Sequence, residues 1–155
     1  LTGLYNRVKL DSVLQENMSL SLRYGNIFSV IIIDIDFFKK INDNFGHQVG
    51  DDVLKECSYI LSQNIRNVDT LGRWGGEEFL VVCPETLKDG AKDLAIKLNK
   101  AIKLHKFSTY PHSVTISVGV ASCSVKDLNY DDIISNADKA LYEAKNNGRD
   151  RVEVF

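Results

Sequence analysis

The chain has 155 residues, 44% hydrophobic and 26% charged, a composition typical of one globular domain with a substantial core. Its net charge of −2 gives no sign of a nucleic-acid or membrane-surface partner, although a local basic patch for a nucleotide would not show in that sum. No apolar run is long enough to span a bilayer, and no secretory signal is visible. The three widely spaced cysteines, Cys57, Cys83 and Cys123, argue against structural zinc and a disulfide framework, and favour a reducing, cytoplasmic compartment.

The first predicted elements are a helix and a buried strand. The helix is expected over residues 7–24, with Asn6 as its cap. The residues of its apolar side are expected to be Val8, Val13, Leu14 and Leu20. The run NIFSVIIIDIDFF, residues 26–38, is an unbroken β-branched segment, typical of a central strand covered on both faces. It contains Asp34 and Asp36, which are two positions apart and therefore project from the same face of the strand.

Helices and strands alternate through the rest of the chain. A short helix and a glycine turn precede a long amphipathic helix that ends near Arg66. Gly75 and Gly76 separate two short apolar runs, which predicts a β-hairpin because both glycines can take positive φ. Later elements are expected at residues 87–106 (helix), 113–125 (strand), 127–150 (helix closed by Gly148) and 151–155 (strand). This order predicts an α+β fold, a ferredoxin-like or palm-type sandwich with a central, mostly antiparallel five-stranded sheet flanked by helices.

Acidic residues are expected to gather where the first strand meets the hairpin. If the two lie side by side, Glu77 and Glu78 at the hairpin tip approach Asp34 and Asp36, and these carboxylates need a balancing partner. Magnesium prefers oxygen ligands together with substrate phosphates, so it is the predicted partner. Two alternatives stay open: Asp36 can serve as the N-cap of the following helix, and the glutamates can decorate an exposed hairpin tip.

Several motifs, in order along the chain, carry a resemblance to a known family. They are LTGLYNR, DIDFFKKINDNFGHQVGDDVL, RWGGEEF, ISVGVA and ADKALYEAKNNGRDRV. With these motifs the sequence resembles the GGDEF-domain family, the diguanylate cyclases, over essentially its whole length. The resemblance implies that two GTP molecules are condensed into cyclic di-GMP with release of two pyrophosphates.

The resemblance also implies a metal site at the end of the first strand. Asp34, the carbonyl of Ile35 and Glu77 match the positions that bind Mg²⁺, with Mn²⁺ as an alternative ion. Glu78 lies at the same metal and phosphate site and is expected to support catalysis. Glutamate at position 77 departs from the aspartate of the family name, but it still presents a carboxylate on a longer arm.

Asn42 and Asp51 match the positions that read the guanine edge. The chemistry agrees, because a carboxylate accepts from the guanine N1–H and the exocyclic amine, and an amide both donates and accepts. Aspartate at position 51 also argues against relatives that accept ATP as well as GTP. Spacing alone instead favours turn and helix-start residues beside Gly50. His47 is expected to be a structural hydrogen-bonding residue rather than an acid or base.

Phosphate-binding positions are matched by Lys39, Lys145 and Arg149. The backbone N–H groups of Phe37 and Phe38, at a helix start, are expected to add to this cradle. Lys145 and Arg149 have an alternative role, because cations near a helix C-terminus complement its partial negative charge.

The stretch RNVD places Arg66 and Asp69 at the family's offset for the RxxD inhibitory motif. In that motif an arginine and a carboxylate bind a guanine of cyclic di-GMP, which implies product feedback inhibition. The second arginine that often completes such a site is not evident, and Lys92 or Lys97 could stand in its place.

Because one domain holds one GTP, the reaction is expected to need a two-fold homodimer. Residues 1–155 are expected to be a single GGDEF domain, excised from a larger regulated protein with an N-terminal sensory or regulatory domain. The domain itself is expected to make no membrane contact, whereas anchoring of the parent protein is left open. Two alternatives are a catalytically silent receptor for GTP or cyclic di-GMP, and a domain that only drives dimerisation.

Overall fold

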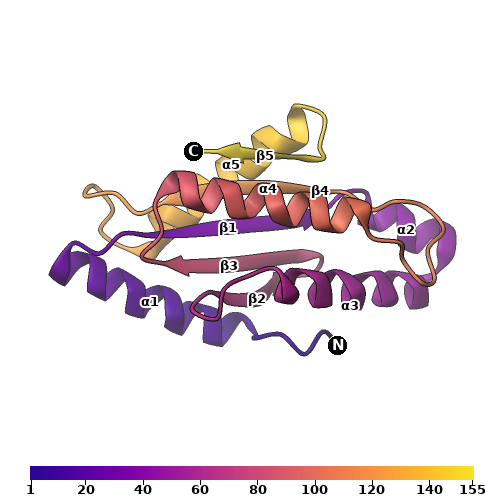
Figure 1. Cartoon of the computed structure of the whole chain (residues 1–155), viewed down its shortest axis with the longest axis horizontal. Helices are drawn as coiled ribbons and strands as arrows, with labels where there is room; N and C mark the ends of the chain where they lie inside the picture. The colour runs from indigo at the N-terminus through magenta and orange to yellow at the C-terminus, as the bar shows by residue number, and fades with distance from the viewer.

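The structure is a computed structural model that describes residues 1–155 and contains five helices and five strands (Figure 1). Their order agrees with the predicted one. The elements are α1 (Arg7–Tyr24), β1 (Phe28–Ile35), α2 (Phe38–Phe45), α3 (His47–Gln63), β2 (Thr70–Gly75), β3 (Glu78–Pro84), α4 (Lys88–Leu104), β4 (Ile116–Ser122), α5 (Tyr130–Asn146) and β5 (Arg151–Val154).

One five-stranded sheet runs through the molecule in the order β2-β3-β1-β4-β5. The β1 strand lies at its centre, pairs antiparallel with both β3 and β4, and has all eight residues buried. The β2–β3 pair is also antiparallel, whereas β5 joins β4 in parallel. The mostly antiparallel five-stranded sheet is therefore confirmed.

Helices cover both faces of the sheet, as expected for the unbroken apolar run of β1. Ile31 and Ile33 belong to a core cluster with residues of α3 and α4, whereas Val30 and Ile32 pack with residues of α1 and α5. In Figure 1, α4 lies in front of the sheet and α5 behind it. Because successive residues of a strand point to opposite faces, Asp34 projects towards the side of α5.

The first helix has the predicted bounds but a different apolar face. The Asn6 side chain accepts a hydrogen bond from Lys9 N at 3.0 Å, which confirms the cap. The predicted apolar positions Val8 and Leu20 are 75% and 38% exposed, so this part of the prediction is wrong. The buried stripe consists of Leu10, Leu14 and Met18. These three residues recur every four positions and form one row along the helix, and the exposed apolar residues lie off that row.

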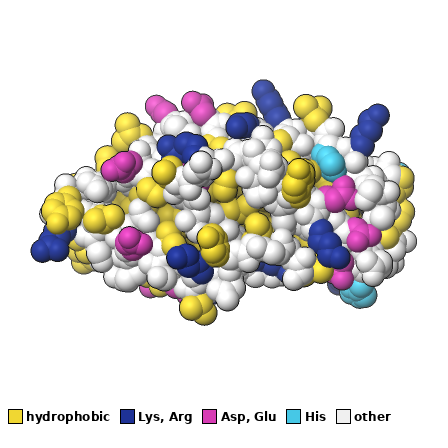
Figure 2. Space-filling model, turned by 60° about the horizontal axis from the view of Figure 1, so that its bottom comes forward, with side chains coloured by type: hydrophobic (Ala, Val, Ile, Leu, Met, Phe, Trp, Pro, Cys, Tyr) yellow, Lys and Arg dark blue, Asp and Glu magenta, His cyan; other side chains and the backbone are white.

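Exposed apolar side chains are interspersed with charged ones of both signs on the face seen in Figure 2. The outer surface of the sandwich is therefore mixed in character on this side. None of the helices combines the length and the apolarity that crossing a bilayer requires.

Gly119 in β4 allows α5 to approach the sheet closely. A Cβ atom at this position would lie 2.2 Å from the carbonyl oxygen of Ala137 and 2.5 Å from the backbone N of Leu141. The helix therefore rests directly on the strand backbone. This contact fixes the position of α5, whose last turn carries Lys145 to the end of β1.

Candidate active site

Asp34 lies at the buried end of β1 and is 7% exposed. Lys145 Nζ donates to its Oδ2 at 2.5 Å, which joins the end of α5 to the central strand. Burial raises the pKa of the Asp34 carboxyl. Lys145 opposes this rise without cancelling it, and the nearby Glu77 carboxylate adds to it. The negative charge of ionised Asp34 is therefore only partly balanced by Lys145, as expected of a carboxylate that binds a further cation.

Asp36 lines the cleft but does not cap α2, the alternative role that the sequence left open for it. Its carboxylate accepts from Thr115 Oγ1 at 2.7 Å, Ser117 Oγ at 2.6 Å and the backbone N of Asp150 at 3.0 Å. The cap position of α2 belongs to Phe37, with no side-chain cap, so the N-cap explanation is wrong. Asp36 instead fastens the segment after α5 to the sheet. Its partners lie about eighty and more residues away along the chain, and no local motif marked them.

The connection between β2 and β3 brings both glutamates to the end of β1. Gly76, at φ +46°, and Glu77 form the turn, and the carbonyl of Glu77 accepts from Ile35 N at 3.4 Å. Glu78 is the antiparallel partner of Asp34. Burial, followed by the charge of Asp34, raises the pKa of Glu78. The hairpin acids thus approach Asp34, whereas Asp36 forms bonds elsewhere.

A cleft of about 450 Å³ opens at this end of the sheet. Most of the predicted metal- and phosphate-binding residues line it. The lining residues are Asp34, Ile35, Asp36, Phe37, Phe38, Lys39, Lys40, Asp43, Glu77, Lys145 and Arg149. Cationic side chains from α2, α5 and the segment after α5 thus share one cavity with the carboxylates of β1 and the hairpin turn.

Phe37 forms part of the cleft wall in an uncommon backbone conformation. Its φ of +56° lies in the left-handed region, which a bulky residue adopts only where the surrounding structure enforces it. Lys40 Nζ and Arg149 Cζ lie 4.7 and 4.8 Å from its ring centroid. The guanidinium of Arg149 also donates to the Lys145 carbonyl at 3.4 Å, so the helix-terminus role is present for Arg149. Sequence reasoning missed Lys40, although it follows Phe37 at a helical spacing of three.

Asn42 and Asp51 lie at the junction of α2 and α3, outside the residues that line the cleft. Both are half-buried, and neither side chain forms a hydrogen bond within the chain. A Cβ atom at Gly50 would lie only 1.8 Å from Asn42 Oδ1. The Asn42 side chain can adopt its position only because residue 50 is glycine. Asn42 lies within α2 rather than in a turn, whereas Asp51 lies near the start of α3, as the alternative from spacing alone expected. His47 is exposed and its side chain makes no hydrogen bond, so its predicted structural role is wrong.

Arg66 and Asp69 lie at the other end of the sheet and bind each other. Arg66 Nη2 and Nε donate to the two carboxylate oxygens of Asp69 at 2.8 and 3.2 Å, and Arg66 N adds a third bond at 2.9 Å. The Asp69 side chain is fully buried, whereas that of Arg66 is 53% exposed. Thr86 Oγ1 accepts from Arg66 Nη2 at 2.6 Å. Whether Lys92 or Lys97 completes the inhibitory site stays a prediction.

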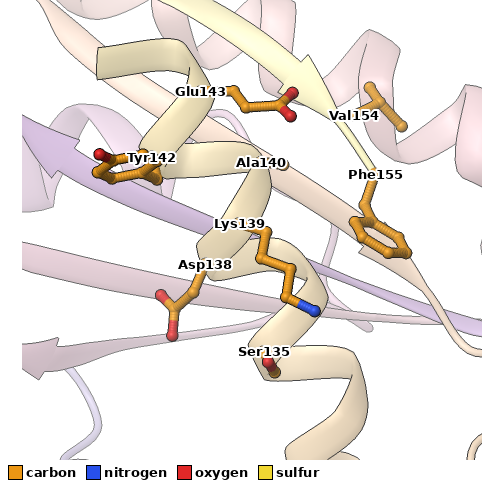
Figure 3. Close-up of a pocket in the computed structure, with 8 residues that line it drawn as sticks. All are labelled: Ser135, Asp138, Lys139, Ala140, Tyr142, Glu143, Val154 and Phe155. Carbon is orange, nitrogen blue, oxygen red and sulfur yellow. The ribbon is translucent and has the colours of Figure 1, made fainter. Parts of the chain in front are cut away.

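A second hollow, of about 620 Å³, lies between the outer face of α5 and the end of β5 (Figure 3). It contains none of the predicted site residues. Figure 3 shows Asp138 and Glu143 on different turns of α5 and pointing in different directions, and Tyr142 on the far side of the helix from Phe155. Because these groups do not converge, the cleft at the end of β1 is the stronger candidate for a reaction.

The donor set at the end of β1 fits a hard divalent cation. Asp34, Glu77 and Ile35 line the cleft and offer oxygen atoms alone, which suits magnesium. No group of three or more His, Cys, Asp or Glu side chains converges in the manner of a complete protein metal site. The fit is therefore to an ion that keeps water or phosphate oxygens among its ligands.

The family model for the diguanylate cyclase GGDEF domain matches residues 1–151. The chain belongs to the GGDEF family. The response regulator PleD of Caulobacter vibrioides is 38% identical over 98% of this GGDEF domain, and diguanylate cyclase A of Treponema denticola is 44% identical over 81% of it. In both comparisons the chain spans 34% of the relative, about a third of its length.

Solved GGDEF structures have the same fold. The active GGEEF domain of a diguanylate cyclase from Vibrio cholerae matches with a TM-score of 0.93 and 36% identity, over 98% of this chain and 97% of the other. The GGDEF domain of DgcB from Caulobacter crescentus, in complex with c-di-GMP, matches with a TM-score of 0.94 and 26% identity, over 99% and 92%. The fold is thus shared with both an active domain and a c-di-GMP complex.

Proposed function

We propose that this GGDEF domain is a diguanylate cyclase, which condenses two GTP molecules into cyclic di-GMP with release of two pyrophosphates. The observation that carries the proposal is the meeting of Asp34, Glu77 and Lys145 in one cleft, although these residues come from three distant parts of the sequence. The carboxylates suit a bound metal ion, and the cationic side chains suit the phosphate oxygens of the triphosphate that the metal ion carries.

The metal would be held by Asp34, Glu77 and the carbonyl of Ile35. Magnesium, or manganese in its place, supplies positive charge that lowers the pKa of the attacking 3′-hydroxyl and neutralises the α-phosphate. Lys145 Nζ is hydrogen-bonded to Asp34 Oδ2, so a cation held by Asp34 would leave Lys145 free to bind phosphate oxygens.

The triphosphate is held by groups around the mouth of the cleft. Lys39 and Arg149 offer charge, and the backbone N–H groups at Phe37 and Phe38 lie where α2 begins. In this proposal the left-handed conformation of Phe37 orients these N–H groups towards the phosphates. The lysine and arginine side chains bind oxygens as the nucleotide enters.

The guanine is read by Asn42 and Asp51, whose half-buried polar groups have no partner within the chain. The Asp51 carboxylate accepts from N1–H and the exocyclic amine, and the Asn42 amide pairs with the remaining edge. Adenine presents an acceptor at N1 and therefore repels this carboxylate. We accordingly propose GTP rather than ATP as the substrate.

The chemical step joins two GTP molecules held by two copies of the domain. The 3′-oxygen of each GTP attacks the α-phosphorus of the other in line, so two P–O bonds form and two bonds to pyrophosphate break. Glu78, whose pKa is raised, is suited to accept the hydroxyl proton directly or through water. Because each site holds one nucleotide, catalysis requires a face-to-face homodimer with two-fold symmetry.

Cyclic di-GMP is proposed to inhibit the enzyme at Arg66 and Asp69. Since the Asp69 side chain is buried against Arg66, the exposed guanidinium is the part that a guanine can reach first. Full use of the carboxylate requires the two side chains to separate. The existing pair therefore lowers the affinity of this site for the product.

The regulation and the location of the protein are also proposals. PleD is a response regulator of which this chain spans 34%, so we propose that a sensory or regulatory domain controls the pairing of two such domains. The three cysteines are buried and unpaired, which suits a reducing cytoplasm.

The test is incubation with GTP and Mg²⁺ of the chain fused to a dimerising coiled coil. Cyclic di-GMP and pyrophosphate are expected, with losses of at least about 100-fold in Asp34→Asn and Glu77→Gln. Glu16→Gln, an exposed acid on α1, is the matched control and is expected to retain activity. Binding of GTP or cyclic di-GMP without any product, in the forced dimer, would instead establish a receptor.

A further inference from the structure

The hairpin turn that carries Glu77 has little packing of its own. Its glycines, Gly75 and Gly76, face open space, since a Cβ atom at either would meet nothing within 4 Å. The adjoining strand is also irregular: Arg73 pairs with Phe79 and Gly75 with Glu78, so Trp74 is the extra residue of a β-bulge. A turn of this kind needs a brace from outside the hairpin to hold a catalytic carboxylate in place.

Arg7, at the start of α1, contacts the bulge directly. Its guanidinium carbon lies 3.3 Å from the ring centroid of Trp74, and its Nη1 donates to the Trp74 carbonyl at 3.5 Å. Asp11 Oδ1 lies 3.6 Å from Arg7 Nε, one helical turn further on. The planar guanidinium therefore stacks on the only tryptophan of the chain while an acid on the same helix orients it.

The backbone before α1 strengthens the same contact. Tyr5 forms a parallel bridge with Gly72, and its carbonyl accepts from Arg73 N at 2.9 Å. The Arg73 side chain then crosses the turn, with its Nε donating to the Gly76 carbonyl at 2.8 Å. In Figure 1 the N-terminal segment passes beside the hairpin. An unbroken series of contacts thus runs from the N-terminal segment to the turn.

We propose that Arg7 is a positioning residue of this enzyme: by stacking on Trp74 it fixes the bulge and thereby holds Glu77 and Glu78 towards Asp34. The consequence for catalysis rests on the proposed cyclase function, whereas the brace itself does not. The proposal also makes the segment before α1 a route to the site, because displacement of Tyr5 and Arg7 from the edge of β2 releases the turn.

Loss of the brace should affect turnover more than nucleotide binding. Small misplacements of reacting groups are costly, so Arg7→Ala is expected to lower kcat by about tenfold or more. The guanine contacts at Asn42 and Asp51 are on other elements, so KM for GTP should change by less than about threefold. Arg7→Lys retains the charge but not the planar stack, and is expected to fall between wild type and Arg7→Ala.

The experiment compares wild type, Arg7→Ala, Arg7→Lys and a matched control. The control is Arg23→Ala, because Arg23 is an arginine of the same helix that lies over another aromatic ring, Tyr24, at 5.6 Å. Hydrogen–deuterium exchange of residues 75–79 and acrylamide quenching of Trp74 are measured on the chain without nucleotide, and kcat and KM on the coiled-coil-fused dimer. Faster exchange, stronger quenching and lower kcat in the Arg7 variants, but not in the control, support the proposal.

Two kinds of failure are distinguishable. If wild type makes no cyclic di-GMP, the proposed function fails, and exchange of residues 75–79 still decides whether Arg7 braces the turn. If Arg7→Ala and Arg7→Lys leave exchange and quenching as in wild type, or leave kcat unchanged in an active enzyme, the positioning role is refuted. Circular dichroism establishes whether each variant is folded. If Arg7→Ala does not fold, the comparison of Arg7→Lys with wild type decides the test.

Discussion

Asp34, which lines the cleft, and Glu78, which does not, face each other across the β1–β3 pair as direct antiparallel partners. Like charges in this arrangement destabilise a sheet. Lys145 binds only the first of them, at 2.5 Å, and burial raises the pKa of both carboxyl groups. The folded domain without a cation therefore retains unfavourable negative charge at its proposed catalytic centre.

Glu78→Gln is expected to change how stability depends on pH. A raised pKa in the folded state favours folding at low pH, and this contribution is lost as the pH rises through the folded-state pKa. Glutamine resembles the protonated acid, so the variant should be more stable than wild type at pH 7 to 8. The difference should close as the pH falls towards 4.5, the ordinary pKa of glutamic acid.

Urea unfolding at a series of pH values, without divalent cations, measures this effect. Asp93→Asn, which removes an exposed acid on α4, provides the control and should run parallel to wild type. A Glu78→Gln variant that is less stable than wild type at pH 7.5 would show that the carboxylate contributes net stabilising contacts.

Gly119→Ala is expected to destabilise the fold by about 3 kcal/mol or more, the range of severe overpacking. The added Cβ would meet backbone atoms of Ala137 and Leu141, which cannot rotate away as a side chain can. The helix must therefore move off β4, and Lys145 with it. Chemical unfolding gives the stability, and residual cyclase activity at low temperature reports the displacement of Lys145.

Gly90→Ala is the matched control for this clash. Gly90 lies in the first turn of α4, and its added Cβ would meet only the methyl group of Thr86, at 3.3 Å. Alanine is the better helix former, so the change should be neutral or stabilise by up to about 1 kcal/mol. Equal losses of stability at positions 90 and 119 would contradict the close-approach explanation.

Periodicity and turn signals predicted the element order, because the strongest patterns belong to fully buried elements. The apolar run of β1 is covered on both faces and leaves no ambiguity. The face of α1 was harder to predict, because apolar Val8 and Leu20 remain in solvent. A helix that covers the edge of a sheet buries one narrow row, and its hydrophobic composition does not reveal which row.

The residues that line the cleft were predicted largely through the family motifs. The hydrogen bonds between their side chains were not predicted. Thr115 and Ser117 donate hydrogen bonds to Asp36, and Lys145 donates one to Asp34. Local sequence cannot show these contacts, because they join segments some 80 to 110 residues apart. The stack of Arg7 on Trp74 was missed for the same reason. Spacing predicts which residues share an element, and tertiary packing decides which of them pair.

Gly50→Ala is expected to impair guanine recognition with little loss of stability. The added Cβ would lie 1.8 Å from Asn42 Oδ1, the end of a flexible side chain, so Asn42 must rotate away. Loss of its guanine contact should raise KM for GTP by about tenfold, with a smaller effect on kcat. Steady-state kinetics and a urea titration measure the two effects. Wild-type KM in a folded Gly50→Ala domain would exclude Asn42 from guanine binding.

Arg66→Ala is expected to abolish inhibition by cyclic di-GMP and to weaken the fold. The substitution removes two of the three hydrogen bonds to the buried Asp69 carboxylate, which should cost about 1–3 kcal/mol in the free energy of unfolding. Arg66→Lys retains a charge near Asp69 but loses the two-pronged geometry, so it should recover most of the stability and little of the inhibition. Calorimetric binding of cyclic di-GMP, together with urea unfolding, separates the two roles. Undiminished product inhibition in a folded Arg66→Ala enzyme would place the inhibitory site elsewhere on the domain.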